Sequence, residues 1–367
     1  MTFQYLRICT LIFLTTIMFS LNAIATDDNG RVSETEVCFT VNVPGDPDSS
    51  TVHGTLFATK QYDKNKRAVV LLHGAASDRS AWTGLAPLTP NIPQSLARGG
   101  YGVFAIDRIG YGESTYERDP GWGFNLTVNT QIETTREIVN QIQDGSFIVT
   151  EGSCEEGTPS GQSADSVFMA GHSSGALIAQ AFATRYDDLA GIIVLAWSGM
   201  EPGGAAIGWL VNNHILPQLF NEGKEYVTWV PYVDGYSMEC ESGFFNAQGA
   251  SPVVIETVCT EGFLETTPIA EFFDLGDVVV EVAADVGNVD DTAVLFVMGE
   301  MDAYMPGPAG GPSGEEVDIQ TPEIKHWQDN CNCDVSVVEA RHSSHMIMAH
   351  RDMFFASARI TNWLDHH

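Results

Sequence analysis

Two adjacent serines lie between glycines in the stretch VFMAGHSSGALIAQAFA, a spacing that suits nucleophilic catalysis. Gly171-His172-Ser173-Ser174-Gly175 fits the pattern G-x-S-x-G, whose central residue, Ser173, is the candidate nucleophile. The apolar run before the motif predicts a strand and the run after it predicts a helix, so Ser173 would lie in the sharp turn between them. Flanking glycines keep such a turn free of clashes, and a helix N-terminus favours nearby negative charge. An ordinary strand–helix turn is the alternative.

Strand and helix patterns along the chain predict the scaffold that would hold this turn. EVCFTVNV and TVHGTLFAT are typical of an early antiparallel pair, whereas AVVLLHG, YGVFAID, SVFMAGHS, LAGIIVLAWSG, TAVLFVMGEMD and CDVSVVEA are typical of buried parallel strands. Helices are expected at residues 127–144, after Ser174 and at about 350–364. This alternation predicts an α/β fold with a doubly wound, mostly parallel sheet.

The alternation breaks at residues 200–290, which are irregular and rich in aromatic side chains. We expect this segment to be a cap or lid inserted between the strand ending near residue 199 and the strand starting near residue 292. Residues 26–199 and 291–367 would then form one core domain, which a chain of 367 residues is long enough to build. The stretch PGPAGGPSGEE predicts a flexible loop before the last strand.

The sequence resembles the α/β-hydrolase family over nearly all of the chain after residue 25. The resemblance rests on His73-Gly74 after one strand, on the stretch DRIGYGES from Asp107 after the next, on the serine turn, and on the order of the elements. It implies an oxyanion hole made by the backbone N–H groups of Ala75 and Ser174, with no chemical role for the Ser174 side chain. One such donor typically contributes about 100- to 1000-fold in rate.

The family order is serine, then acid, then histidine, so the resemblance implies that the base follows the last strand. The stretch VVEARHSSHMIMAHRDMFF contains His342, His345 and His350. We assign the base to His345, because Ser-His followed by Met-Ile-Met is similar to the histidine turn of the family. His342 is the alternative base, and His350 is expected to open the last helix.

The acid of the family follows the strand AVLFVMG, where the sequence continues as GEMDAY. We assign this role to Asp302, which would orient the imidazole and stabilise its charge. Glu300 is the second choice, and Glu201 occupies an alternative acid position used by some family members. Asp107 is expected to be structural and to fix its loop with Arg108.

The resemblance implies a serine hydrolase that cleaves carboxylic esters through an acyl-enzyme, with the cap binding the apolar part of a small-molecule substrate. The same residues could serve amide or C–C bond cleavage or acyl transfer. A non-catalytic extracellular binding protein on this fold is the alternative from another class. Ser173 and HGAA disfavour the family's epoxide and halide chemistries. No P-loop, G-x-G-x-x-G or HExxH motif occurs, so no cofactor or metal is expected.

Charge and the N-terminal stretch bear on partners and location. The net charge of −31 disfavours nucleic acid as a partner and indicates a solvated acidic surface.

The N-terminal stretch predicts a cleaved signal peptide over residues 1–25, because it contains Arg7, a short apolar run and Ala23-Ile24-Ala25. We therefore expect a secreted or periplasmic protein without a stable membrane anchor. The sequence does not indicate an oligomeric state.

Cysteine usage supports an oxidising compartment. Cys9 would leave with the signal peptide, and an even number then remains: Cys38, Cys154, Cys240, Cys259, Cys331 and Cys333. Such a set suggests disulfides with about 15 possible connectivities. Cys240 and Cys259 are close enough in sequence to bridge a local loop, whereas the CNC pair is expected not to close on itself because so small a ring is strained. The spacing does not fit a metal site.

Overall fold

The structure is a computed structural model that describes residues 30–83, 89–114, 116, 122–199, 215–227, 244–246, 248–259, 266–302 and 320–367. It divides into two units, Met1–Arg31 and Val32–His367, and all elements described below belong to the second. Four features expected from the sequence lie outside the described residues: the signal peptide, the loop PGPAGGPSGEE, Glu201 and Cys240. In the described part of the chain, no helix has the length and apolar character needed to cross a membrane.

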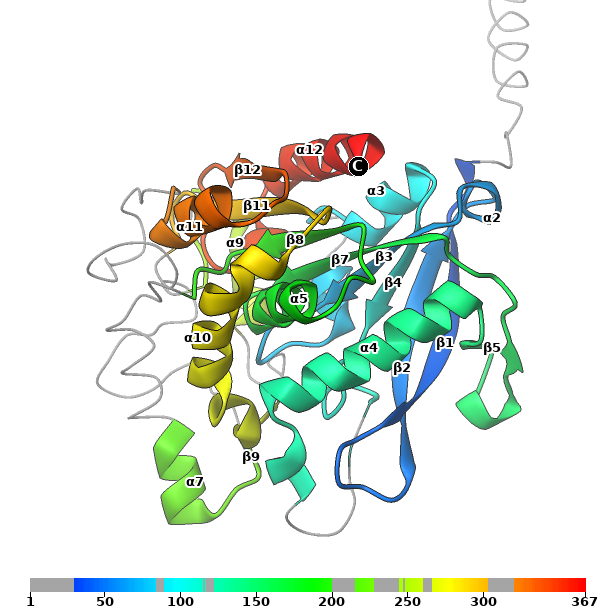
Figure 1. The fold of residues 1–367 in the computed structure, drawn as a ribbon, viewed down its shortest axis with the longest axis horizontal. Coiled ribbons are helices and arrows are strands. Elements are labelled where there is room, and N and C mark those ends of the chain that lie inside the picture. Colours follow the sequence, from blue (N-terminus) through cyan, green and yellow to red (C-terminus); the bar gives the residue numbers. More distant parts are fainter. Residues whose placement is uncertain are drawn as a thin grey trace, which may run out of the picture. The chain divides into compact units, whose positions relative to one another are not determined.

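A ten-stranded sheet forms the centre of the second unit, in the order β12-β11-β8-β7-β3-β4-β2-β1-β5-β6 (Figure 1). Its strands are β1 (Ser33–Asn42), β2 (Ser49–Ala58), β3 (Arg67–Leu72), β4 (Gly102–Ile106), β5 (Ile148–Thr150), β6 (Thr158–Pro159), β7 (Ser166–His172), β8 (Gly191–Leu195), β11 (Ala293–Gly299) and β12 (Val335–Ala340). Neighbouring strands from β12 to β4 in this order are parallel. The remaining pairs are antiparallel. The mostly parallel sheet predicted from the sequence is confirmed.

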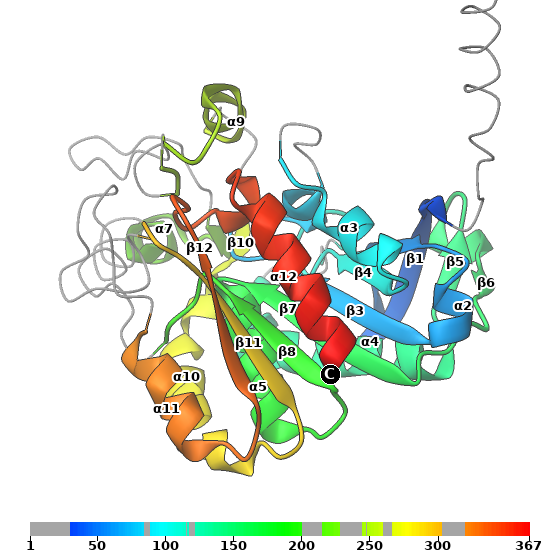
Figure 2. The same ribbon diagram turned by 90° about the horizontal axis from the view of Figure 1, so that it is seen from above.

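Helices flank this sheet on both faces. The helices of the described residues are α2 (Tyr62–Asn65), α3 (Ile92–Arg98), α4 (Val128–Asp144), α5 (Ser174–Arg185), α7 (Leu216–Glu222), α9 (Pro252–Val258), α10 (Leu275–Asp285), α11 (Pro322–Asn330) and α12 (Met353–His366), not all of which pack on the sheet. Helices α4, α5 and α10 lie on one face, and α3 and α12 lie on the other (Figures 1 and 2). Helix α4 matches the predicted helix closely, because Thr127 caps its first turn and Gly145, at φ 75°, ends it.

The central strands are apolar on both faces because each face supports its own core. On β3, Val70 and Leu72 belong to the cluster that contains residues of α4 and α5. Val69 and Leu71 belong to the cluster that contains residues of α3 and α12. Side chains of a strand alternate between the two faces, so a continuous apolar run is what a doubly covered strand requires.

Parallel strands place the predicted site residues at a single edge of the sheet. Leu72 of β3 pairs with Ile106 of β4 and with Gly171 of β7, and Gly299 of β11 pairs with Ala340 of β12. The residues that follow these strand ends therefore meet at the carboxyl edge, where ligands bind in open α/β sheets.

The predicted cap, residues 200–290, is described in separate pieces. They include α7, α9, α10 and a small sheet of β9 (Tyr226–Val227) and β10 (Thr267–Pro268). Helix α10 packs against α5, so this part of the interval contacts the helix that follows the serine turn. The division of the chain into core and cap stays a prediction.

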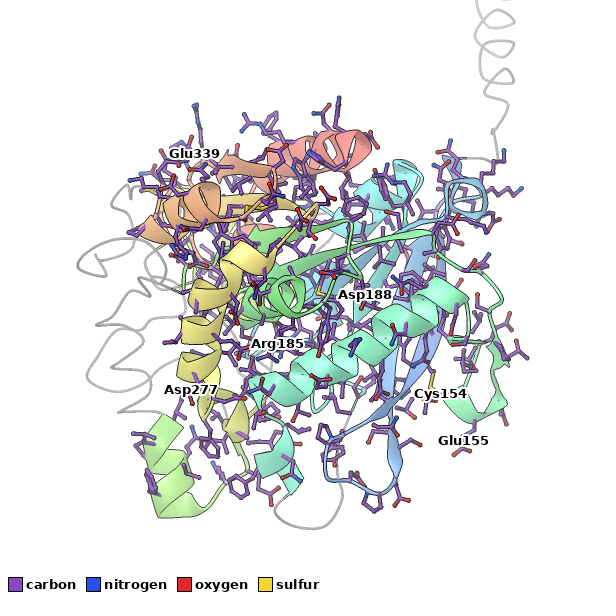
Figure 3. The ribbon with its side chains drawn as sticks, in the orientation of Figure 1. Cys154, Glu155, Arg185, Asp188, Asp277 and Glu339 are labelled. Carbon is purple, nitrogen blue, oxygen red and sulfur yellow. A yellow bond between two sulfur atoms is a disulfide. The ribbon has the colours of Figure 1, made fainter. Side chains whose placement is uncertain are left out.

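Disulfides link Cys38 to Cys154, which is labelled in Figure 3, and Cys331 to Cys333. The expectation that the CNC pair would not close on itself is wrong. Cys331 ends α11 with an extended backbone, and this turn leaves the two Cα atoms 5.2 Å apart, within the usual range for a disulfide. Cys259 is also disulfide-bonded.

Candidate active site

Ser173 occupies a strained turn between β7 and α5. Its φ of 54° and ψ of −123° are unfavourable for a residue with a side chain, a strain that typically costs about 1–3 kcal/mol. The neighbouring chain allows this turn only because glycines flank it. A Cβ on Gly171 would lie 2.1 Å from the Gly175 carbonyl oxygen, and a Cβ on Gly175 would lie 2.5 Å from the Leu72 carbonyl oxygen.

His345 reaches Ser173 from the loop after β12. Its Nε2 lies 3.0 Å from Ser173 Oγ, within hydrogen-bonding distance, although the two residues are 172 positions apart. The backbone carbonyl of His345 accepts a hydrogen bond of 2.8 Å from Nε2 of His172, the residue just before the nucleophile. The serine turn thus holds His345 at its backbone carbonyl as well as at its side chain.

Asp302 holds the other side of the His345 ring. Its Oδ2 lies 3.2 Å from His345 Nδ1, and its side chain is fully buried. The loop after β11 is positioned by the histidine loop, since the N–H of Met301 donates to the carbonyl of Ser343 at 2.9 Å. With Nδ1–H donated to Asp302, the Nε2 lone pair faces the serine hydroxyl, which is the arrangement a general base requires.

The alternative acid and the alternative base lie together, outside this chain of hydrogen bonds. Glu300 accepts a hydrogen bond of 2.8 Å from the backbone N–H of His342 and lies 3.6 Å from its Nδ1. The His342 side chain is 59% exposed. Glu201, the other alternative acid, is outside the described residues.

The predicted oxyanion donors flank the serine turn. Gly74 lies so close that a Cβ there would be 2.9 Å from the Ser173 Cβ, and this close approach carries Ala75 past the nucleophile. Ala76 follows at φ 60°, held by the hydrogen bond of its N–H to Thr267 Oγ1 at 2.9 Å. Within the described residues, the N–H groups of Ala75 and Ser174 donate no hydrogen bond, so both remain available to a substrate oxygen.

His350, which the sequence predicted would open the last helix, instead holds the loop of His345. His350 is fully buried, and its Nδ1–H donates to the carbonyl of Met346 at 2.9 Å. Its Nε2 accepts from the N–H groups of Asn246 at 3.0 Å and Ser344 at 3.3 Å. Burial lowers the pKa of His350 to about 4, so the ring is neutral. It does not open the last helix, which begins at Met353.

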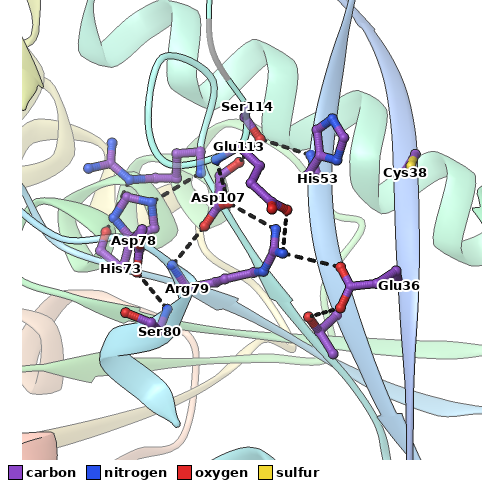
Figure 4. A network of polar contacts seen from close by, with 12 residues as sticks. Glu36, Cys38, His53, His73, Asp78, Arg79, Ser80, Asp107, Glu113 and Ser114 are labelled. Atoms are coloured by element: carbon purple, nitrogen blue, oxygen red, sulfur yellow. Dashed lines mark hydrogen bonds and ion pairs between the residues drawn. The ribbon is translucent and has the colours of Figure 1, made fainter. Parts of the chain in front are cut away.

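Asp107 fixes its loop with Arg79 rather than with Arg108, the partner expected from the sequence. The Asp107 carboxylate accepts hydrogen bonds from the Arg79 backbone N–H at 2.8 Å and from Nη1 at 2.9 Å (Figure 4). The N–H of Glu113 donates to it at 2.9 Å. Arg108 pairs instead with Glu271, so the two neighbouring side chains have different partners. Burial raises the pKa of Asp107 to about 6.

Among the described residues, Cys38, His53 and Cys154 form a group whose ligand atoms are close enough to hold a metal ion. The two cysteines are joined in a disulfide, so neither supplies a thiolate.

The site around Ser173 presents hydroxyl, imidazole, carboxylate and amide groups in the arrangement of nucleophilic acyl transfer.

Comparison with known proteins identifies the same fold. Residues 69–357 match the sequence model of the alpha/beta hydrolase family. A structure from work on LipS and LipT, two metagenome-derived lipolytic enzymes, is 14% identical with a TM-score of 0.51, covering 83% of this chain and 95% of its own. The peroxisomal alpha-beta-hydrolase Lpx1 of Saccharomyces cerevisiae is 14% identical with a TM-score of 0.51, covering 91% and 88%.

Est1E of Butyrivibrio proteoclasticus, solved with bound ferulic acid, is 12% identical with a TM-score of 0.50, covering 89% of this chain and 98% of its own. At these identities the likeness to solved structures establishes the fold alone. No curated protein sequence matches the chain at a significant level.

Proposed function

Because the chain belongs to the α/β-hydrolase family, we propose that it is a serine hydrolase that cleaves carboxylic esters. The observation that carries the proposal is the continuous hydrogen-bonded chain from Ser173 through His345 to Asp302, with contacts of 3.0 and 3.2 Å. A buried carboxylate, a ring held by both nitrogens and a serine in a strained turn match the requirements of an activated nucleophile.

In the proposed reaction, Ser173 Oγ attacks the ester carbonyl while His345 Nε2 takes the hydroxyl proton. The carbonyl oxygen becomes an oxyanion, which the N–H groups of Ala75 and Ser174 stabilise. Collapse of this intermediate breaks the ester C–O bond, and His345 delivers its proton to the leaving alkoxide. Water then attacks the acyl-enzyme with His345 as base, releasing the carboxylic acid and restoring the serine. Asp302 stabilises the imidazolium in both halves.

We propose that the substrate is a small-molecule ester with an apolar part. The Phe244 ring lies in the interval of the predicted cap, and its centroid is 6.0 Å from that of the His345 ring. An aromatic face beside the base offers a surface for an apolar acyl or alkyl group. The described relatives include lipolytic enzymes and a protein that binds ferulic acid, an aromatic carboxylic acid, which is consistent with this substrate class.

We further propose that the protein works in a secreted or periplasmic setting. The signal-peptide pattern of residues 1–25 motivates this location, and the disulfides Cys38–Cys154 and Cys331–Cys333 are consistent with an oxidising compartment. Expression with the native N-terminus, followed by N-terminal sequencing of protein recovered outside the cytoplasm, tests it. A mature protein that begins near Thr26 is expected, and an intact N-terminus on cytoplasmic protein would refute it.

The activity is tested with a fluorophosphonate probe and p-nitrophenyl esters of graded acyl length. Wild-type protein should be labelled and should turn over esters, and Ser173→Ala should abolish both. Ser166→Ala, at the opposite end of the same strand, is the matched control and should keep both. Well-folded wild-type protein that shows neither labelling nor turnover would reject the enzyme and favour the non-catalytic binding protein.

A further inference from the structure

An arginine is buried directly behind the proposed oxyanion hole. The Arg108 side chain is 1% exposed and follows β4 at the same sheet edge as Ser173. Its Nε–H donates to the carbonyl of His73 at 3.0 Å, and its Nη2 donates to Ser174 Oγ at 3.2 Å. One rigid guanidinium therefore joins the residue before Gly74-Ala75 to the residue whose N–H is the second oxyanion donor.

The backbone of Arg108 holds the same loop a second time. Its N–H donates to His73 Nε2 at 3.1 Å, and His73 Nδ1–H in turn donates to the carbonyl of Gly74 at 2.8 Å. His73 is fully buried. The carbonyl of His73, the carbonyl of Gly74 and the hydroxyl of Ser174 are thus set by a single residue, and these groups surround the two proposed donors.

The countercharge of Arg108 comes from the interval of the predicted cap, residues 200–290. Nη1 donates to Glu271 Oε2 at 3.1 Å, and the Tyr111 hydroxyl donates to the same oxygen. The guanidinium lies over the Tyr111 ring, 4.4 Å from its centroid. Thr267, which holds the N–H of Ala76, is only four residues before Glu271, so this segment is tied to the oxyanion loop at two points.

Stability alone does not account for this arrangement. A buried ion pair gains little over well-packed apolar residues, because both charges lose their hydration. Glu271 Oε1 is buried without a partner among the described residues, which adds to the cost. A cation beside the first turn of α5 also opposes the helix dipole. The fixed fork of the guanidinium does, however, suit the exact spacing of two hydrogen-bond acceptors.

We propose that Arg108 is a positioning residue that sets the distance between the Ala75 and Ser174 N–H groups, acting through the His73 carbonyl and the Ser174 hydroxyl. This inference rests on the proposed hydrolase function and deepens it. In this proposal the Ser174 side chain has a role that the sequence did not suggest: its hydroxyl accepts the hydrogen bond by which Arg108 aligns the start of α5 with the oxyanion loop.

The test compares an inhibitor that forms an oxyanion with one that does not. A trifluoromethyl ketone is converted by the serine to a hemiketal oxyanion, whereas the matching alcohol only occupies the site. Arg108→Gln should weaken the ketone and lower kcat by about 10- to 100-fold, a part of what the loss of one donor costs. The affinity for the alcohol and KM should change less than about twofold. Arg108→Lys, which retains the charge without the fork, should recover only part of the loss.

Two further variants make the result specific. Ser174→Ala removes the hydroxyl that Arg108 contacts but keeps the backbone N–H. It should show the same selective loss of ketone affinity and kcat, and combining it with Arg108→Gln should give no further loss. Arg79→Gln removes a neighbouring arginine that pairs with Asp107, Glu36 and Glu113 (Figure 4). Among the described residues, no hydrogen bond or ion pair joins the Arg79 side chain to Ala75 or Ser174. This variant is the matched control and should leave the affinity for the ketone unchanged.

Failure of this inference and failure of the proposed function give different results. If wild-type protein is not labelled by the fluorophosphonate, the hydrolase function fails. If it is labelled but the variants weaken ketone and alcohol equally, or change only the unfolding temperature, Arg108 is merely structural and the inference is overturned. Should Arg108→Gln not fold, Ser174→Ala decides, because it removes one of the two proposed contacts of Arg108 with the loss of a single hydroxyl.

Discussion

Replacing His350 with glutamine should make the stability of the protein less sensitive to acid. The ring is buried and neutral, and its lone pair on Nε2 accepts from the Asn246 and Ser344 N–H groups. Burial lowers its pKa from 6.5 to about 4, opposed by the hydrogen bond to the Met346 carbonyl and by the charge of Asp302. Glutamine places an oxygen near the position of Nε2 and cannot take up a proton.

The sign and size of the effect follow from this pKa difference. Between pH 6.5 and about pH 4 the unfolded chain binds a proton at His350 and the folded protein does not. The contribution of His350 to stability is therefore complete above pH 6.5 and falls as the pH decreases, by about 1.4 kcal/mol per pH unit. Over the whole interval the loss is about 3 kcal/mol.

Urea unfolding followed by tryptophan fluorescence at several pH values between 4.5 and 6 measures this slope. In His350→Gln the free energy of unfolding should depend on pH less steeply than in wild type, by about 1.4 kcal/mol per unit. His350→Asn is the matched control, since it keeps the donor to Met346, loses the acceptor and is equally unable to titrate. Its absolute stability should differ from that of His350→Gln while the slopes agree. Wild-type slopes in both variants would refute the reasoning.

Three other changes have defined outcomes. Gly74→Ala introduces a Cβ 2.9 Å from the Ser173 Cβ. The kcat of the proposed esterase should therefore fall at least about tenfold, and the free energy of unfolding measured in urea should fall by about 1–3 kcal/mol. A wild-type kcat would contradict the close approach. Asp302→Asn should lower kcat by about 1000-fold or more, whereas Glu300→Gln, whose carboxylate holds another loop, should change ester turnover less than twofold. Cys154→Ser opens a disulfide whose cysteines are 116 positions apart and should lower the free energy of unfolding by up to about 5 kcal/mol. Cys333→Ser opens one with a separation of 2 and should lower it by under about 2 kcal/mol. Equal shifts in unfolding temperature would argue against loop entropy as the cause.

Local pattern predicted most of the scaffold, because the properties that specify it are short-range. The strand run in AVVLLHG and the helix at residues 127–144 were visible as an apolar run and as a capped segment, and both occur with small shifts at their ends. The serine turn was visible as a G-x-S-x-G pattern between a strand run and a helix run, although Gly175 is required by the carbonyl of Leu72 on strand β3, which is distant in sequence. His345 and Asp302 followed from their place after predicted strands, once the family order was applied.

Which side chains contact one another across the fold could not be predicted in the same way. Asp107 contacts Arg79 rather than its neighbour Arg108, which pairs with Glu271, a residue far along the chain. The closing of Cys331 on Cys333 depends on how the chain leaves α11. Arg108 and Glu271 are 163 residues apart, and no spacing in the sequence relates them.

A few consecutive residues suffice to predict that Ser173 stands in a strand–turn–helix, and the resemblance to the α/β-hydrolase family adds that Asp302 and His345 follow later strands. The folded structure adds that His345, and not the alternative His342, reaches Ser173, and that Arg108 contacts Ser174. The contact of His345 with Ser173 spans 172 positions and that of Arg108 with Ser174 spans 66, and both exist because parallel strands bring their carboxyl ends to one edge of a single sheet.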